Sequence, residues 1–400
     1  MIFAGEICLF EAQEECFVKK LLLVAGRGYP ANTAMSSRYH ALALLFKAAD
    51  CEVTLVTKGE YNAKKIKYHQ GIPYISVSGK VNCKLTRAYD LLVGIPWHVK
   101  KLLQTNQYDG VLMTTRIPLL LRIMKSAERK GVRLFYDAVE WYSPSQYKKG
   151  EKAYQYRKIN KLLTEEIDKR FYVISISKYF EEYFRSRGIK TVRIPAILDV
   201  QSVACEKQAP EDKTVILYAG SPGKKDYLHE ILEACAQLTP EERNKLEVRL
   251  IGIKEMDLIQ SCGVSEKTMC DVRQIVKCMG RRPHEEVLQN LQRAHFTVLI
   301  RPEEERYAKA GFPTKVPESL ATGTPVICNL TSDLGMYLRD GKNAIVLASE
   351  NVEDVVIGLR RAINLSSGEK EKMSVTARKT AEEAFDYRKY VGSLIKLFDS

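Results

Sequence analysis

Short apolar runs alternate with longer amphipathic segments along this chain, and the alternation occurs twice. The first series predicts strands at residues 20–25, 52–57, 110–113, 133–136 and 172–175, with helices that include 119–129, 150–169 and 176–187. The second series predicts strands at 214–219, 247–253, 275–279, 296–300, 325–329 and 344–347, with helices that include 226–238 and 284–293. Alternating strands and helices form parallel sheets that are covered by helices on both faces. We therefore expect an α/β chain of two doubly wound domains that face a cleft.

A polar stretch at residues 201–213 separates the two series, and 400 residues are too many for one average core. The predicted segments are an N-terminal extension at 1–18, a first domain at 19–199, a linker at 200–213, a second domain at 214–380 and a final helical segment at 381–400. Open α/β sheets bind ligands at the carboxyl ends of their strands, so the functional residues are expected in the cleft.

The loop at residues 310–318 precedes a short predicted helix and a buried strand. Thr314 is the expected N-cap of this helix, and Gly323 stands where a helix end favours positive φ. The first N–H groups of a helix suit an anion such as a diphosphate. Glu318 lies one turn into the helix, where its carboxylate could accept hydrogen bonds from both hydroxyls of a ribose. The alternative is an ordinary loop with a surface glutamate.

This segment resembles the donor-binding signature of the family-four retaining glycosyltransferases, which have the two-domain GT-B fold. Most members carry two glutamates separated by seven residues; Glu318 matches the second, and Ala310 stands at the first. The chain is more similar to a subgroup with a Pro-x-Lys-x-x-Glu motif, matched here by Pro313, Lys315, Glu318, Leu320, Ala321, Gly323, Pro325 and Val326. In relatives the first glutamate contacts the sugar, so Ala310 leaves the identity of the donor sugar open.

The resemblance implies a nucleotide-sugar donor, bound in part by Gly311, Phe312, Thr314 and Lys315. It also implies that the final helix crosses back to the first domain. The length and domain order match those of the family from about residue 18 to the end.

A second loop, from Gly220 to Asp226, contains two glycines and two lysines before a predicted helix. Glycines allow close approach to a diphosphate, and lysine supplies charge. The resemblance maps Lys225 to the lysine that contacts the leaving diphosphate, and Ser221 to a position that is arginine in relatives. Lysines that are simply solvated in a turn are the alternative. Arg301 ends the strand before the Glu318 loop and would either contact a phosphate or sugar hydroxyl, or cap the strand edge.

Polar residues that follow strands of the first half are the candidates for acceptor binding. These residues are Asn32, Arg38, Arg116, Asp137 and Glu140. The carboxylates of Asp137 and Glu140, next to aromatic rings, suit hydrogen bonding and stacking against a sugar. Asp137 could instead cap the following turn. A glycoside hydrolase is a poor alternative, because only one plausible carboxylate pair is available.

The net charge of +13 is confined to the first half of the chain. Residues 1–200 contain 33 Lys and Arg against 19 Asp and Glu, whereas residues 201–400 contain 29 against 30. Anionic lipid, a lipid-linked phosphate or an acidic polysaccharide would fit such a surface. We do not expect nucleic acid, because no zinc finger, RNP-type motif or dense basic helix accompanies the charge. A basic surface with no particular partner is the alternative.

Other motifs limit the function further. Ten scattered cysteines without paired spacing predict neither a zinc site nor a disulfide framework. No Asp-x-Asp stands at a strand end, so no metal and no cofactor are expected. The chain shows no signal-peptide pattern and no apolar run of about 18 residues. We expect a cytoplasmic protein that associates peripherally with the inner membrane face.

Together these features predict a metal-independent, retaining glycosyltransferase with Lys225 and Glu318 as catalytic residues. The acceptor would be lipid-linked or a polysaccharide precursor. Two rivals stay open: a non-catalytic partner protein with this fold, favoured by Ala310 and Ser221, and a nucleotide-sugar epimerase.

Overall fold

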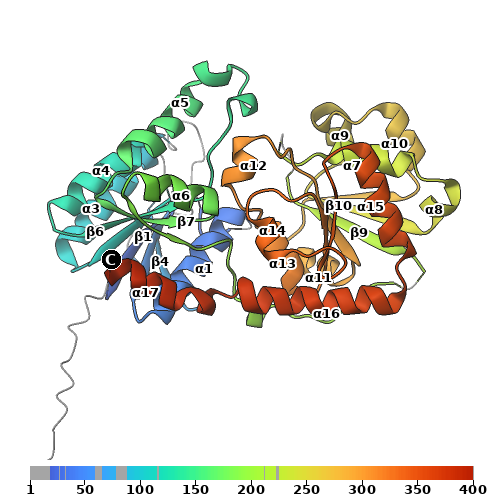
Figure 1. Cartoon of the computed structure of the whole chain (residues 1–400). Coiled ribbons are helices and arrows are strands. Elements are labelled where there is room, and N and C mark those ends of the chain that lie inside the picture. Colours follow the sequence, from blue (N-terminus) through green and yellow to red (C-terminus); the bar gives the residue numbers. More distant parts are fainter. Residues whose placement is uncertain are drawn as a thin grey trace, which may run out of the picture.

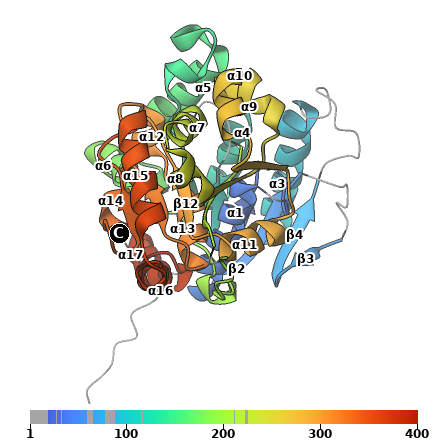
Figure 2. The same cartoon turned by 90° about the vertical axis from the view of Figure 1, so that its right-hand side faces the viewer.

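The structure, a computed structural model, describes residues 19–26, 28–31, 33–58, 65–77, 88–114, 117–210, 212–221 and 225–399. Two α/β domains lie side by side, each built on a central sheet with helices around it (Figure 1). In the view turned by 90° the second domain lies in front of the first (Figure 2). The prediction of an α/β fold with two doubly wound parallel-sheet domains is therefore confirmed.

The first sheet has eight described strands in the order β3-β4-β2-β1-β5-β6-β7-β8. These strands are β1 (Lys20–Val24), β2 (Glu52–Thr57), β3 (Lys67–His69), β4 (Ile72–Ser76), β5 (Gly110–Met113), β6 (Arg133–Ala138), β7 (Phe171–Ser175) and β8 (Lys190–Arg193). All neighbouring pairs are parallel except β3 with β4, a hairpin at the sheet edge. The central strands β1 and β5 are almost wholly apolar and buried, as expected of strands that helices cover on both faces.

The described helices of the first domain are α1 (Ala34–Ala48), α3 (Ile95–Thr105), α4 (Ile117–Glu128), α5 (Tyr154–Lys161) and α6 (Lys178–Ser186). A π-helical turn at Asp90–Gly94 leads into α3, and another at Leu162–Glu166 follows α5. Short 3-10 turns occur at Pro144–Gln146, Gly150–Lys152 and Val200–Ser202. The helix predicted at 150–169 is thus a 3-10 turn, a short α-helix and a π turn in series.

The second sheet has six described strands, all parallel, in the order β11-β10-β9-β12-β13-β14. These are β9 (Thr214–Ala219), β10 (Leu246–Ile251), β11 (Val276–Gly280), β12 (Phe296–Leu299), β13 (Val326–Cys328) and β14 (Ala344–Val346). The helices are α7 (Leu228–Ala236), α8 (Pro240–Asn244), α9 (Glu255–Cys262), α10 (Glu266–Val272), α11 (His284–Gln292), α12 (Arg306–Ala310), α13 (Lys315–Ala321), α14 (Leu334–Tyr337), α15 (Val352–Asn364) and α16 (Ser367–Ala384).

The chain ends with a 3-10 turn at Tyr387–Tyr390 and α17 (Val391–Asp399). In Figure 1 the red helix α16 runs along the second domain, and α17 lies under the first sheet. Leu394, Leu397 and Phe398 are buried in the core of the first domain, where Phe398 meets Phe46 and Phe135. The last segment of the chain therefore holds the two domains together.

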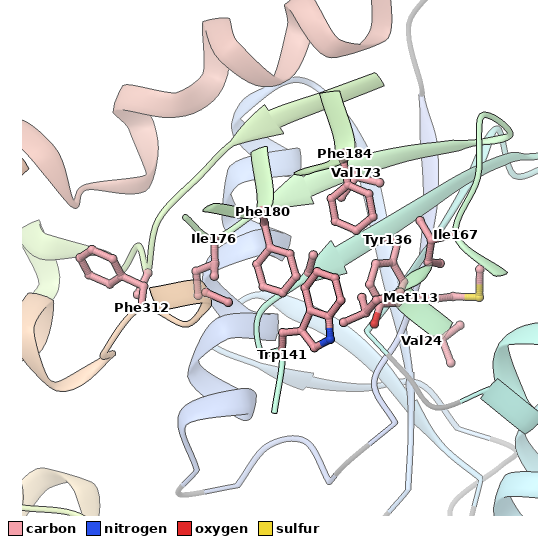
Figure 3. Packing of buried hydrophobic residues seen from close by; sticks show 14 of the residues in the cluster. Val24, Met113, Tyr136, Trp141, Ile167, Val173, Ile176, Phe180, Phe184 and Phe312 are labelled. Carbon is pink, nitrogen blue, oxygen red and sulfur yellow. The ribbon is translucent and has the colours of Figure 1, made fainter. Parts of the chain in front are cut away.

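One apolar cluster is continuous across the domain boundary. In the first domain Trp141 stacks on Phe180 at 6.0 Å between ring centroids. In the second domain Phe312 packs against Tyr337 and Phe385, and Figure 3 shows Phe312 beyond Ile176 on the side of the second domain. Burial of this shared apolar surface favours a fixed relation between the two sheets.

No helix among the described residues is both long enough and apolar enough to cross a membrane.

Candidate functional site

The carboxyl ends of three strands from the two domains point toward the same region. β9 ends at Ala219 and is followed by Gly220, and β12 ends at Leu299, two residues before Arg301. From the first domain, β6 ends at Ala138, two residues before Glu140. A salt bridge between Lys225 and Glu140 joins the two domains here. The site therefore lies where the predicted cleft brings the two sheets together.

A buried carboxylate that the sequence did not single out organises the side of the second domain. Asp226 Oδ1 accepts a hydrogen bond from Arg301 Nε at 2.8 Å, and Oδ2 accepts one from Tyr218 OH at 2.8 Å. Lys315 Nζ donates to Asp226 Oδ2, donates to Tyr218 OH at 2.7 Å and lies 4.0 Å from the Tyr218 ring centroid. We call Tyr218, Asp226, Arg301 and Lys315 the Asp226 cluster.

The charges of the Asp226 cluster do not cancel. Burial acts to raise the pKa of Asp226, but Lys315 and Arg301 outweigh it and hold that pKa below its usual value. Burial lowers the pKa of Lys315, and the Asp226 carboxylate opposes this shift. Two cations share one carboxylate, so the cluster keeps an excess of positive charge. That excess suits an anionic ligand.

Gly220 makes room for the Lys315 side chain. Its φ is +145°, a region that only glycine adopts readily. A Cβ at Gly220 would lie 2.5 Å from Lys315 Cε and 2.9 Å from Lys315 Nζ. The glycine of this loop is thus required both by its backbone and by the close approach of the lysine.

Asn329 fixes the backbone of Arg301. Its Nδ2 donates to Arg301 O at 2.6 Å, and its Oδ1 accepts from Arg301 N at 3.0 Å. Asn329 is buried just beyond the end of β13. The arginine therefore pairs with Asp226 from a fixed backbone rather than capping a strand edge.

Glu318 lies on α13 with its carboxylate half-buried. Its carboxylate accepts no hydrogen bond from the residues that the structure describes. Burial raises its pKa, while His284, at the start of α11, and Lys315 act to lower it. A half-buried carboxylate without a protein donor beside a cationic cluster suits a hydroxyl-bearing ligand. Thr314 stands at the N-cap position as predicted, although its hydroxyl makes no capping hydrogen bond.

The first domain contributes a carboxylate and an aromatic ring. Glu140 Oε1 accepts from Lys225 Nζ, and Glu140 Oε2 accepts from Tyr142 OH. Lys225 Nζ also lies 4.9 Å from the Tyr142 ring centroid. The structure thus brings together two predicted site residues, Lys225 and Glu140, that are 85 positions apart in the chain.

Next to this contact, α12 docks on the first domain. Arg306 donates to Tyr142 O at 2.8 Å and lies 4.8 Å from the Trp141 ring centroid. Ser177 Oγ donates to Ala310 O at 2.6 Å. Ala310 is fully buried, so the position that is glutamate in most members of the resembled family presents no polar side chain.

Two predicted acceptor residues have a different role in the structure. Arg38 and Asp137 are buried, and Arg38 donates to both carboxylate oxygens of Asp137, at 2.8 and 3.3 Å. Arg38 also donates to Pro195 O and to Ile194 O. Each side chain has its partners inside the first domain, so both stabilise the fold there. Their predicted contact with an acceptor stays a prediction.

The remaining predicted site residues differ in their exposure to solvent. Phe312 is buried in the shared apolar cluster, where its ring packs at the domain boundary. Gly311 is buried, and a Cβ there would lie 2.9 Å from Tyr307 O. Ser221 is exposed. Asn32 and Arg116 lie outside the described residues. Among the described residues, no three His, Cys, Asp or Glu side chains are grouped so as to hold a metal ion.

Comparison with known protein families finds a match in the second domain. Residues 203–380 match the family model described as glycosyl transferases group 1. A search of curated proteins finds no matching sequence. The second half of the chain is therefore similar to group 1 glycosyl transferases, which supports a glycosyltransferase. The Pro-x-Lys-x-x-Glu subgroup stays a prediction.

Solved structures of glycosyltransferases share the fold of the whole chain. Sucrose-phosphate synthase from Thermosynechococcus elongatus is 14% identical with a TM-score of 0.73, covering 95% of this chain and 98% of that chain. WaaG, a glycosyltransferase involved in lipopolysaccharide biosynthesis, is 16% identical with a TM-score of 0.67, covering 94% and 99%. HepE of Anabaena, solved in complex with UDP, is 14% identical with a TM-score of 0.66, covering 96% and 100%. The chain has the GT-B fold of these proteins.

Proposed function

From the similarity to group 1 glycosyl transferases, we propose that this chain transfers a sugar from a nucleotide-sugar donor to a lipid-linked or glycan acceptor. The reaction would retain the configuration of the sugar and would need no metal ion. The observation that carries the proposal is the Asp226 cluster. Arg301 and Lys315 converge on one buried carboxylate at the carboxyl ends of β9 and β12. Open α/β sheets bind ligands at this edge, and the excess positive charge of the cluster favours an anionic one.

The donor diphosphate would lie against the positive charge of the cluster, with Lys225 beside it. Negative charge grows on the diphosphate as the sugar leaves. Fixed cations stabilise that charge more strongly in a partly buried site than in open water, because water screens charges less there. Lys225 and Lys315 would supply this stabilisation, and Glu318 would bind the ribose hydroxyls through its unoccupied carboxylate. The UDP and UDP-glucose complexes of HepE make uridine donors the first to test.

A thermal-shift screen of nucleoside diphosphates and their sugars tests the donor assignment. A ligand at 100 times its dissociation constant stabilises the folded protein by about 2.7 kcal/mol, which raises the melting temperature by several degrees. Transfer assays with the best donor follow, with and without EDTA. Activity that EDTA abolishes would contradict a metal-independent reaction, and inversion of the anomeric centre would contradict retention.

The acceptor side of the proposal is based on an exposed surface of the first domain. Tyr89, Leu92, Val93 and Trp97 are 60%, 40%, 47% and 55% exposed, around the π turn and α3. Lys101 Nζ lies 5.5 Å from the Trp97 ring centroid. In Figure 1 α3 lies on the side of the first domain away from the second. Aromatic and basic side chains on one helix face suit an anionic membrane surface, which would supply a lipid-linked acceptor.

Co-sedimentation of the full chain with anionic and neutral vesicles tests this association. Trp97→Ala should weaken binding to anionic vesicles, and rising salt should weaken it further. Tyr154→Ala is the matched control, because Tyr154 is also exposed and lies 5.4 Å from Lys158 Nζ, but on α5. Equal loss in both variants would contradict a role for the α3 surface. A chain that ignores anionic vesicles at low salt would point to a water-soluble glycan acceptor instead.

A non-catalytic binding protein is the second candidate, favoured by the buried Ala310. A chain that binds a nucleotide sugar but neither transfers nor hydrolyses it, with the acceptor classes above present, would establish this alternative.

A further inference from the structure

The salt bridge between Lys225 and Glu140 places a carboxylate on the lysine that, in the proposed function, binds the donor diphosphate. Glu140 follows β6 of the first domain, and Lys225 precedes α7 of the second. Both oxygens of Glu140 are engaged, one by Lys225 and the other by Tyr142 OH. The Tyr142 ring lies beside Lys225 Nζ as well. A first-domain carboxylate is therefore held where a phosphate oxygen would be expected.

Geometry and exposure make this contact exchangeable. The side chains of Lys225 and Glu140 are 28% and 37% exposed. Ion pairs with this much exposure contribute little free energy, because water screens them. The Arg38–Asp137 pair is different, since its side chains are 2% and 0% exposed. A diphosphate carries more charge than one carboxylate and can replace Glu140 on Lys225 without breaking a buried pair.

We propose that Glu140 is an internal competitor of the donor: it occupies Lys225 until a nucleoside diphosphate binds and displaces it. This inference rests on the proposed donor site. Displacement would leave the Glu140 carboxylate beside Tyr142, where it would accept a hydrogen bond from an acceptor hydroxyl. Donor binding would thus precede the formation of a complete acceptor site, which gives a physical reason for ordered binding.

The inference is tested by a double-mutant cycle on nucleotide affinity. The four proteins are wild type, Glu140→Gln, Lys225→Met and the double variant, each titrated calorimetrically with UDP, GDP and ADP. Glu140→Gln keeps the side-chain shape and removes the competing charge. It should lower the dissociation constant of the bound nucleotide about two- to fivefold, the range expected for an exposed ion pair. In the Lys225→Met background the same change should have no effect, because the competition needs the lysine.

A control and the contrary outcomes keep the test specific. Glu165→Gln removes an exposed first-domain carboxylate that pairs with Lys161 at 3.6 Å, and it should leave the affinity unchanged. If Glu140→Gln raises nucleotide affinity in both the wild-type and the Lys225→Met proteins, the effect is a general one of charge. If it raises the affinity in neither, Glu140 does not compete with the nucleotide. Either result overturns the inference. If wild type and Glu140→Gln bind a nucleotide with the same affinity, the inference fails but the proposed function stands. Failure of all three nucleotides to bind wild type and Glu140→Gln overturns both proposals.

Discussion

Gly220→Ala tests the packing of Lys315 in the Asp226 cluster. A Cβ at this position would lie 2.5 Å from Lys315 Cε, whereas non-bonded carbons prefer about 3.5–4.0 Å. The lysine would therefore have to move by about 1 Å. Such a shift weakens its hydrogen bonds to Asp226 and Tyr218. The substitution should perturb both stability and donor binding.

The magnitude follows from two contributions. An L residue forced to a φ of +145° costs about 1–3 kcal/mol in backbone strain. Weakening a hydrogen bond to a charged group costs about 1.5–3 kcal/mol. The lower entropy of alanine in the unfolded chain offsets about 0.4–1 kcal/mol of these two costs. The expected net loss of stability is therefore about 2–5 kcal/mol. The affinity of the variant for a nucleoside diphosphate should also fall, because the displaced Lys315 belongs to the proposed donor site.

Gly341→Ala is the matched control. Gly341 also has positive φ, at +67°, but a Cβ there would meet no atom within 4 Å. Its alanine variant should lose only about 1–2 kcal/mol from backbone strain. Urea unfolding midpoints of the two variants are compared under identical conditions, because a two-domain chain need not unfold in one step. Nucleotide titration follows on each variant.

Equal unfolding midpoints for the two alanine variants, with unchanged nucleotide affinity in both, would refute the reasoning. That result would mean that the Lys315 side chain does not lie against Gly220 in solution.

Three further predictions concern single carboxylates and a lysine. Glu318→Ala should fold normally and lose roughly 2–3 kcal/mol of donor affinity, measured by calorimetry; wild-type affinity and turnover would remove Glu318 from the site. Lys225→Ala should lower kcat more than it raises KM, because the charge it meets grows in the transition state; a change in KM alone would make it a docking contact. Burial raises the pKa of Glu230 to about 7, and its Oε2 is buried without a hydrogen-bond partner among the described residues. The stability that comes from its protonated form is therefore fully present below about pH 4.5 and is lost as pH rises through about 7. Glu230→Gln should therefore stabilise the chain by roughly 1–3 kcal/mol at pH 8 and not at pH 4.5, and an equal effect at both pH values in urea unfolding would contradict this.

The strands and their order along the chain were predictable from the sequence. The predictions for residues 52–57, 110–113 and 214–219 match β2, β5 and β9 in full, because buried parallel strands are continuous apolar runs. The β3–β4 hairpin was missed, although Gln70 and Gly71 both have positive φ, as a tight turn requires. Short, half-exposed edge strands lack the apolar pattern that identifies the central ones.

The helical end of the chain begins earlier than its apolar pattern predicts. The final helix was expected from about residue 381, but α16 begins at Ser367, behind a capping box formed by Ser366 and Glu369. The chain then turns at residues 387–390 before α17. Helix boundaries depend on such local caps, which the apolar pattern alone does not place.

The site residues were predictable by type but not by partner. The sequence suggested Lys315 and Arg301 as phosphate ligands, yet it gave no indication that Asp226 lies between them. Asp226 is 75 and 89 positions away from these two residues in the chain. The pairing of Arg38 with Asp137 was missed for the same reason, since they are 99 positions apart and meet only in the folded domain. Pairings of this kind are set by tertiary structure, not by local pattern.

A crystal structure with the nucleoside diphosphate that stabilises the chain most would test the central claim directly. The account predicts that the diphosphate lies against Lys315 and Lys225, that Glu140 has left Lys225, and that Glu318 accepts hydrogen bonds from the ribose hydroxyls. A nucleotide bound elsewhere, or bound here with its ribose away from Glu318, would contradict the account.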